Sequence, residues 1–343
     1  MDKNLRPLLA ITMGDPAGIG PEICVKALAL EEIYAVCRPL IVGDAGIIRN
    51  AMEFCGLPLA LNAVEGPEQG VYRPGTVDVL DLKNLPLPKL LHKQVTADQG
   101  RASFEYVERA IRLALAKRVG GTVTGPINKA AVNAAGFHYA GHTEIYAALT
   151  GSKRYAMMLV DRDFRVVHVS THVSLRKACE AVYKERVLEV IELAHEAVAK
   201  LCGRPPRLAV AGLNPHCGEG GLFGTEDEEE IIPAVHSAKA KGILAEGPLP
   251  ADTVFSKMKG GQFDAVIVMY HDQGHIPMKL LGFQYDESTG RWDSLAGVNV
   301  TLGLPIVRTS VDHGTAFDKA GEGRANPQSM IEAIKMAAAL CSG

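Results

Sequence analysis

Short apolar runs alternate with segments of helix length along almost the whole chain. Four of the apolar runs have the length and composition of buried strands: residues 8–13, 39–43, 76–82 and 119–124. Four other segments have helical signatures, either apolar side chains at helical spacing or a proline in the first turn: residues 21–30, 102–118, 185–201 and 329–340. Alternation of this kind is typical of a three-layer α/β/α fold with a largely parallel sheet.

One segment interrupts the alternation. Between Leu281 and Gly297 the chain is polar and rich in turn residues, and it contains the only tryptophan. We expect a surface hairpin or loop there, inserted between two functional stretches. At 343 residues the chain exceeds the size of a single typical core, so two lobes are expected.

Composition narrows the class of protein. The hydrophobic content of 47% and the charged content of 22% describe a globular protein. A net charge of -3 gives no reason to expect nucleic acid or anionic membranes as partners, and no apolar stretch has the length of a membrane span. The first residues lack the apolar core of a signal peptide. Seven scattered cysteines without CxxC spacing indicate reduced thiols, so we expect a cytoplasmic protein.

Three histidines each follow an apolar run with the character of a strand: His172, His216 and His271. Ligands gather outside the carboxyl ends of parallel strands, so separate strands can bring these imidazoles to one point. Three protein ligands with one open position suit a catalytic divalent metal. A single histidine near a strand end is more often a packing or surface residue. His216, however, lies in a glycine-dense polar loop, and His271 in a stretch dense in metal-binding groups, where Cys217 and His275 are alternative ligands.

Other segments indicate an anionic small substrate. Small residues at 12–22 lie between a predicted strand and a predicted helix, where backbone amides can approach an anion, although a simple tight turn explains them equally well. Their spacing matches neither the dinucleotide nor the P-loop fingerprint. His142 and Thr143 open another helix, where Thr143 can cap it and His142 can bind a phosphate or carboxylate. Arg308 offers a planar fork for the same groups, and Lys279 a compact charge.

Together these segments resemble the PdxA family, the 4-hydroxythreonine-4-phosphate dehydrogenases of vitamin B6 synthesis and their relatives. The resemblance rests on motifs that keep the family order from about residue 8 to the C-terminus: Gly-Asp-Pro-Ala-Gly-Ile-Gly-Pro-Glu at 14–22, Thr-Gly-Pro-Ile-Asn-Lys at 124–129, Gly-His-Thr-Glu at 141–144, Asn-Pro-His-Cys-Gly-Glu-Gly-Gly at 214–221, Tyr-His-Asp-Gln-Gly at 270–274 and Arg-Thr-Ser-Val-Asp-His-Gly-Thr-Ala at 308–316. It implies a two-lobed α/β fold like that of isocitrate and isopropylmalate dehydrogenases. It also implies NAD bound without a Rossmann fingerprint.

The resemblance also implies an organisation of the chain. We expect a first α/β lobe built from both termini, residues 1–130 plus 305–343. A second α/β lobe, residues 131–304, is expected to carry the metal ligands and the dimer interface. The family forms homodimers in which the ligands of one site come from both subunits.

Position by position, the family's metal ligands fall on the same three residues that the strand ends single out: His172, His216 and His271. Its substrate contacts fall on five positions: His142, Thr143, Lys279, Asn299 and Arg308. Three residues are candidates for the proton acceptor: Lys279, Asp252 and Asp272. The implied cofactors are NAD, to which no contact residue is assigned, and one divalent metal ion per site, either zinc, cobalt, manganese or magnesium.

The implied reaction is oxidation of a secondary alcohol next to the phosphorylated carbon, followed by decarboxylation of the resulting β-keto acid. The insert at residues 284–294, together with residues 316–321, resembles the branch that acts on D-threonate or D-erythronate 4-phosphate and forms dihydroxyacetone phosphate. The biosynthetic 4-hydroxythreonine-4-phosphate dehydrogenase is the alternative. More remote alternatives are an aromatic cis-dihydrodiol dehydrogenase, a metal-dependent phosphatase or hydrolase, and a non-catalytic metabolite-binding protein.

Overall fold

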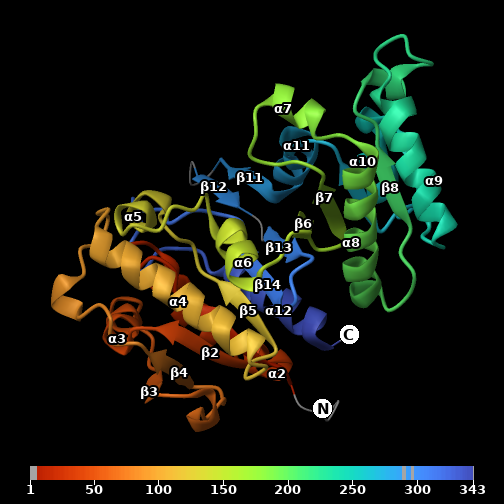
Figure 1. The fold of residues 1–343 in the computed structure, drawn as a ribbon. Coiled ribbons are helices and arrows are strands. Elements are labelled where there is room, and N and C mark those ends of the chain that lie inside the picture. Colours follow the sequence, from red (N-terminus) through yellow and green to blue (C-terminus); the bar gives the residue numbers. More distant parts are fainter. Residues whose placement is uncertain (1–5, 288–290, 295–296, 343) are drawn as a thin grey trace. The chain divides into compact units, whose positions relative to one another are not determined.

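The computed structural model describes residues 6–287, 291–294 and 297–342, and it divides the chain into two compact units (Figure 1). Unit 1 comprises Met1–Lys153 and Leu304–Ser342, so it is built from both ends of the chain, and unit 2 comprises Arg154–Gly303. Each unit is an α/β structure. The α/β class predicted from the alternating pattern is confirmed.

The sheet of unit 1 is entirely parallel, in the order β3-β4-β2-β1-β5-β14. Its strands are β1 (Leu8–Thr12), β2 (Arg38–Gly43), β3 (Ala60–Val64), β4 (Thr76–Asp81), β5 (Gly121–Thr124) and β14 (Val307–Val311). The chain moves from β1 outward to β2, and later crosses back from β4 to β5 on the other side of β1. The carboxyl ends of β1 and β5 therefore flank the point where the strand order reverses, which is the usual place for a ligand in such a sheet.

The helices of unit 1 form two groups. They are α1 (Gly20–Leu28), α2 (Glu31–Val36), α3 (Ala45–Phe54), α4 (Ala97–Leu115), α5 (Lys129–Ala134), α6 (His142–Thr150) and α12 (Gln328–Ser342), with short 3-10 turns η1 (Pro67–Gln69) and η2 (Leu87–Lys89). The helices α1, α2, α3 and α12 pack together, and α4 packs on β1, β2 and β5. The helices α5 and α6 contact α4, as Figure 1 shows. Parallel crossovers are right-handed as a rule, and such crossovers running in opposite directions along a sheet place their helices on opposite faces, which agrees with two separate groups of helices.

The boundary between the units lies at residue 153, whereas the sequence analysis places it at residue 130. The difference arises because α5 and α6 share one apolar cluster with α4. Its buried members are Phe104, Val107, Ile111, Val132, Ile145 and Tyr146. Burial of these side chains attaches the two short helices to unit 1, and nothing in their local pattern shows it.

The sheet of unit 2 has the order β13-β6-β7-β10-β8-β9. Its strands are β6 (Ala156–Asp161), β7 (Phe164–His168), β8 (Leu208–Ala211), β9 (Ala245–Leu249), β10 (Ala265–Val268) and β13 (Val298–Leu302). The strands β7, β10, β8 and β9 run parallel, and β6 runs antiparallel to both β7 and β13. The parallel half therefore contains all three strands that precede the predicted metal ligands.

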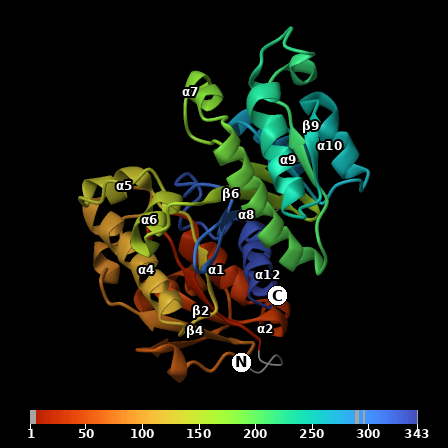
Figure 2. The same ribbon diagram turned by 45° about the vertical axis from the view of Figure 1, so that its right-hand side comes forward.

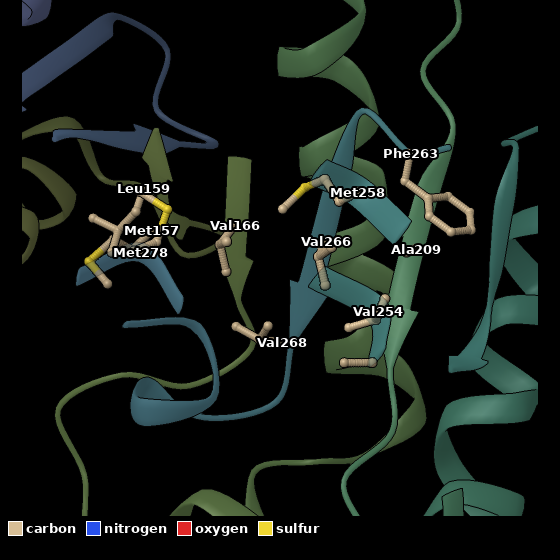
Figure 3. Close-up of a cluster of buried hydrophobic side chains, with 11 residues drawn as sticks. Met157, Leu159, Val166, Ala209, Val254, Met258, Phe263, Val266, Val268 and Met278 are labelled. Atoms are coloured by element: carbon tan, nitrogen blue, oxygen red, sulfur yellow. The ribbon is translucent and has the colours of Figure 1, made fainter. Parts of the chain in front are cut away.

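The helices of unit 2 are α7 (Leu175–Glu180), α8 (Lys184–Cys202), α9 (Ile232–Ala240), α10 (Ala251–Lys259) and α11 (His271–Gly282), with the shorter turns η3 (Pro215–Gly218) and η4 (Asp227–Ile231). The helices α8 and α9 lie side by side (Figure 2), whereas Val254 and Met258 of α10 and Met278 of α11 pack against Val166 and Val268 of the sheet (Figure 3). Within the described ranges, no helix is long and apolar enough to cross a membrane.

The predicted polar insert contains a hairpin. The strands β11 (Phe283–Asp286) and β12 (Arg291–Ser294) pair antiparallel in a sheet of their own. Residues 288–290 and 295–296 of the insert lie outside the described residues. The hairpin follows α11 directly and precedes β13.

Candidate active site

The three strands that precede His172, His271 and His216 are direct neighbours in the sheet. β10 pairs in parallel with β7 on one side and with β8 on the other, so their carboxyl ends share one edge. The strands end before the histidines: His172 lies in the connection after β7, His271 begins α11 after β10, and His216 lies in the turn η3 after β8. The topology therefore places all three residues on the connections where α/β sheets bind ligands.

His271 and His172 lie closest together among the three predicted ligands. Their ring centroids are 5.6 Å apart with the rings tilted by 50°. His271 Nδ1 lies 2.6 Å from Asp272 Oδ1. A carboxylate on Nδ1 fixes the ring orientation and leaves Nε2 for a ligand, as is common for histidines that bind metals.

His216 occupies a strained turn. His216 and Cys217 have φ of 53° and 56°, and Glu219 has 45°, in the left-handed region that non-glycine residues rarely adopt. The fully buried carboxylate of Asp227 holds the start of this turn, because it accepts hydrogen bonds from the backbone N–H groups of Leu213 and Asn214 at 2.9 and 3.0 Å. The side chain of His216 is exposed, and its ring centroid lies 6.3 Å from that of Phe223.

The described part of one chain does not bring three possible ligands together. Among its residues, no group of three or more histidine, cysteine, aspartate or glutamate side chains is arranged to hold a metal ion. The structure thus pairs His172 with His271 and leaves His216 on a separate turn.

His275, the alternative ligand named from the sequence, lies one turn after His271 on α11. His275 stacks on His271 with ring centroids 3.6 Å apart, and its other neighbour is the buried His168 at 4.9 Å. A Cβ atom on Gly274 would lie 2.6 Å from His168 Nε2, so only glycine allows α11 to pack this closely on β7. Burial lowers the pKa of His168 to about 3, and His275 contributes in the same direction, so His168 is neutral.

A second group of predicted residues lies in unit 1, around Arg308 on β14. Arg308 is buried, donates from Nη2 to Thr124 Oγ1 at 2.9 Å, and lies over the ring of Tyr146 at 5.6 Å. Tyr146 is fully buried on α6 and donates its hydroxyl to Thr122 Oγ1 at 3.0 Å. These contacts fix the guanidinium in one orientation.

His142 begins α6, on the helix that carries Tyr146. Its Nε2 is shielded from solvent and has no hydrogen-bond partner among the described residues. Burial lowers the pKa of His142 well below its usual value, and the Arg308 guanidinium and Lys129 act in the same direction. Burial also lowers the pKa of Arg308 to about 10, which leaves it charged at neutral pH. Unit 1 therefore pairs a buried cation with a neutral imidazole, a combination suited to an anionic group.

The other predicted residues are spread over both units. Thr143 follows His142 in the first turn of α6. In unit 2, Lys279 lies two turns after His271 on α11, Asp252 lies in the first turn of α10, and Asn299 lies on β13, where its Oδ1 is buried without a hydrogen-bond partner among the residues described. Such an atom is available to a bound ligand.

The turn after β1 holds a buried acid. Asp15 is fully buried, and its Oδ1 accepts from the backbone N–H of Ala17 at 2.8 Å, whereas its Oδ2 has no hydrogen-bond partner in the described chain. Burial raises the pKa of Asp15 to about 6 against the opposing backbone hydrogen bonds.

Imidazoles on the connections after parallel strands in unit 2 and a buried arginine on β14 of unit 1 are typical of an α/β enzyme that handles small anionic metabolites. The family model described as "Pyridoxal phosphate biosynthetic protein PdxA" matches residues 35–337. The chain belongs to the PdxA family, and it is an oxidoreductase that acts on a CH–OH group. The family predicted from the motifs is confirmed.

Relatives match the chain over nearly its full length. The D-threonate 4-phosphate dehydrogenase of Cupriavidus necator is 45% identical over 337 residues, which cover 98% of each chain. The crystal structure of a 4-hydroxythreonine-4-phosphate dehydrogenase from Klebsiella pneumoniae has a TM-score of 0.87 at 41% identity, and it covers 99% of this chain and 100% of that one. A β-decarboxylating dehydrogenase from Thermococcus kodakarensis shares the fold, with a TM-score of 0.50 at 15% identity over 96% of this chain and 81% of that one.

Proposed function

We propose that the chain catalyses the NAD-dependent and divalent-metal-dependent oxidation, with decarboxylation, of a 4-phosphorylated four-carbon hydroxy acid. D-threonate 4-phosphate is the first choice of substrate and D-erythronate 4-phosphate the second. The observation that carries the proposal is the pairing of His172 with His271, 5.6 Å apart at the ends of neighbouring parallel strands, within a family of dehydrogenases. The 45% identity to the Cupriavidus necator enzyme supports the substrate, and 4-hydroxythreonine 4-phosphate is the alternative.

The proposed reaction has two balanced steps. The alcohol at C3 loses its proton to the protein, and C3 transfers a hydride to NAD, which gives NADH and a 3-keto acid. The bond between C1 and C2 then breaks, carbon dioxide leaves, and its electron pair forms an enol that is protonated at C2. The product is dihydroxyacetone phosphate.

The residues fit a divalent metal in their chemistry. Imidazole nitrogens are suitable ligands for zinc or cobalt, and the Asp272 carboxylate on His271 Nδ1 prepares that ring to bind through Nε2. A bound zinc, cobalt, manganese or magnesium ion would act as a Lewis acid on the substrate. We propose His172, His216 and His271 as its ligands.

On the protein side, we assign recognition of the substrate's anionic groups to Arg308, His142 and Thr143 of unit 1. Arg308 is already held by Thr124 and Tyr146, so little side-chain entropy is lost when an anion binds. Lys279 and Asn299 of unit 2 are the remaining proposed contacts. The buried Asn299 Oδ1 accepts a hydrogen bond and therefore suits a substrate hydroxyl.

For the proton acceptor we propose Lys279. It follows His271 and His275 at four-residue spacing on α11, which places the three residues on one side of the helix. Asp272 is engaged with His271, so its proposed task is to orient that ring. Asp252 remains a candidate on α10.

The proposed assembly is a homodimer in which both subunits supply ligands to each site. Within one chain, the described donors do not form a group of three, which agrees with a site completed by a second copy. Large apolar side chains are exposed on the connections around the proposed ligands and on α11: Val173, Leu175, Leu222, Phe223, Ile276 and Leu280. Exposed apolar groups of this size are typical of a surface that a partner covers.

An NAD-reduction assay tests the proposal. D-threonate 4-phosphate, D-erythronate 4-phosphate and 4-hydroxythreonine 4-phosphate are compared with and without added divalent metal after chelation. We expect metal-dependent NADH formation, with dihydroxyacetone phosphate and carbon dioxide as products from the first substrate. Turnover that survives complete chelation would remove the metal from the proposal, and turnover of 4-hydroxythreonine 4-phosphate alone would change the substrate. Phosphate release without NADH would favour the phosphatase alternative.

A further inference from the structure

Gln273 lies two residues after His271, and its side chain connects two strands of unit 2. Its Oε1 accepts a hydrogen bond from the Met269 backbone N–H at 2.7 Å, and its Nε2 donates to the Gly212 carbonyl at 2.8 Å. Met269 and Gly212 are the residues that follow β10 and β8. The carboxamide is buried, and both of its partners belong to the backbone.

The bridge lies where the ladder between β8 and β10 would continue. The last paired residues are Ile267 and Val210, and two positions further along each strand are Met269 and Gly212. At these positions the Gln273 carboxamide bridges the Met269 N–H and the Gly212 carbonyl, where a regular ladder would have a direct N–H···O=C bond. A side-chain amide has the same donor and acceptor as a peptide group, so it acts as a spacer of fixed width where the strands separate.

Both ends of the spacer are closely packed. A Cβ atom on Gly212 would lie 2.8 Å from Asp227 Oδ1 and 2.9 Å from Cys217 Sγ, next to the turn that carries His216. At the other end, a Cβ atom on Gly274 would lie within 2.9 Å of side chains of the sheet, so the first turn of α11 cannot shift toward it. A change at Gln273 therefore moves the backbone of the two connections, since neither end has free space to absorb it.

We propose that Gln273 is a positioning residue, which sets the separation between the turn that carries His216 and the helix start that carries His271. The proposal rests on the proposed metal site, because it assigns to Gln273 the placement of two of its ligands. Glutamine suits this position because the bridge needs one donor and one acceptor at the same distance from the backbone. Ionised glutamate has no donor, methionine has neither group, and asparagine is one methylene shorter.

The test compares Gln273→Met and Gln273→Glu with the wild-type enzyme and with Gln262→Met. Gln262 lies on an exposed turn of unit 2 and controls for the same chemical change. Metal affinity is measured by titrating zinc into chelated protein against a chromophoric chelator. The visible absorption of the cobalt-loaded protein reports the geometry of the ligands, and kcat and KM are measured separately. All measurements are made well below the onset of thermal unfolding.

We expect Gln273→Met to lower zinc affinity about 10-fold, as for other residues that orient metal ligands. The cobalt spectrum should change, and kcat should fall while KM for the phosphorylated acid stays within about 3-fold, because the anion contacts are untouched. Gln273→Glu keeps the side-chain length and the acceptor for the Met269 N–H but loses the donor to the Gly212 carbonyl, so it should lower zinc affinity and kcat in the same direction. Gln262→Met should match the wild-type protein in every measurement.

The outcomes separate this inference from the proposed function. Variants that melt earlier but keep wild-type zinc affinity, cobalt spectrum and kcat would overturn the positioning role and leave the metal site intact. A wild-type protein that binds neither zinc nor cobalt would overturn the metal site and the inference together. Effects of equal size in Gln262→Met would also overturn the inference.

Discussion

The predicted site residues of the two units lie in different surroundings. In unit 1, the predicted site residues are enclosed by the fold: Arg308 is buried against Thr124 and Tyr146, and His142 Nε2 is shielded from solvent. In unit 2, the predicted ligands His172 and His216 are exposed. In unit 2, hydrogen bonds hold the residues next to the predicted ligands, namely Asp227, Asp272 and Gln273.

This difference indicates two ways of preparing a site. A buried guanidinium with fixed neighbours is ready to receive an anion within one chain. Exposed imidazoles on fixed turns can bind a group from outside the chain, which agrees with the proposed metal ion and the proposed second subunit. Residues of unit 1 are therefore expected to act mainly on substrate affinity, and residues of unit 2 on turnover.

The largest effect is expected for His271→Ala. Loss of a proposed metal ligand should remove several kcal/mol of transition-state stabilisation, so kcat should fall by about 1000-fold. Zinc titration and steady-state kinetics measure the effect, and His236→Ala, an exposed histidine on α9, is the matched control. For contrast, His142→Ala should raise KM more than it lowers kcat. If both variants changed KM and kcat in the same proportion, the division of labour between the units would be wrong.

A smaller effect is expected for Arg308→Lys. Lysine keeps the charge but cannot reproduce both the bond to Thr124 and the stacking over Tyr146. The misplaced lysine should lose one charged hydrogen bond to the substrate anion, worth roughly 2 kcal/mol. KM should therefore rise about 30-fold, with little change in kcat. Arg112→Lys, on the exposed face of α4, controls for the substitution. If kcat fell by the same factor by which KM rose, Arg308 would contribute to the chemical step as well as to substrate binding.

The sequence was sufficient to predict the strands that precede the three histidines, because apolar runs of strand length stand out between polar segments. It could not show that β10 lies between β7 and β8, since strand order depends on contacts far apart in the sequence. The extent of unit 1 was missed for the same reason: Tyr146 belongs to it through packing on α4.

Residues that support the connections leave a weaker signal in the sequence than histidines at strand ends do. Gln273 bonds to a backbone group of another connection, and Asp227 bonds to backbone groups more than ten residues earlier in its own connection. Such partners leave no spacing pattern. A weak signal existed in each case. Gln273 lies in the dense polar stretch after β10, and Asp227 is the buried member of an acidic run whose neighbours Glu228 and Glu229 are exposed.

Substitutions at Asp272 test whether metal binding in unit 2 depends on the residues that orient the proposed ligands. Asp272→Ala removes the carboxylate that lies 2.6 Å from His271 Nδ1, so zinc affinity should fall about 10-fold. Asp272→Asn can still accept a hydrogen bond from Nδ1 and should lose less. Asp163→Asn, at an exposed acid of unit 2, serves as the control. Zinc affinity unchanged in Asp272→Ala would show that the ring of His271 is oriented by its other contacts.

The smallest effect concerns stability, and it tests whether unit 1 is as enclosed as described. Asp15 has a folded-state pKa of about 6 against 3.8 for the free group, because burial disfavours its ionised form. Stability from its retained proton is present below pH 3.8 and is lost as pH rises toward the folded-state value, since the unfolded chain ionises first. Asp15→Asn has no such proton. Its unfolding free energy relative to the wild type should therefore rise by about 1 kcal/mol between pH 5 and pH 7.5.

Urea unfolding at the two pH values measures this difference, in which the contributions of all other titrating groups cancel. Asp98→Asn, an exposed acid in the first turn of α4, should show no comparable change. If the difference in unfolding free energy between Asp15→Asn and the wild type stayed constant with pH, the Asp15 carboxyl would be in contact with solvent or with a hydrogen-bond donor. The turn after β1 would then be open at the point where the strand order of unit 1 reverses, and unit 1 would resemble unit 2 more closely than its buried groups indicate.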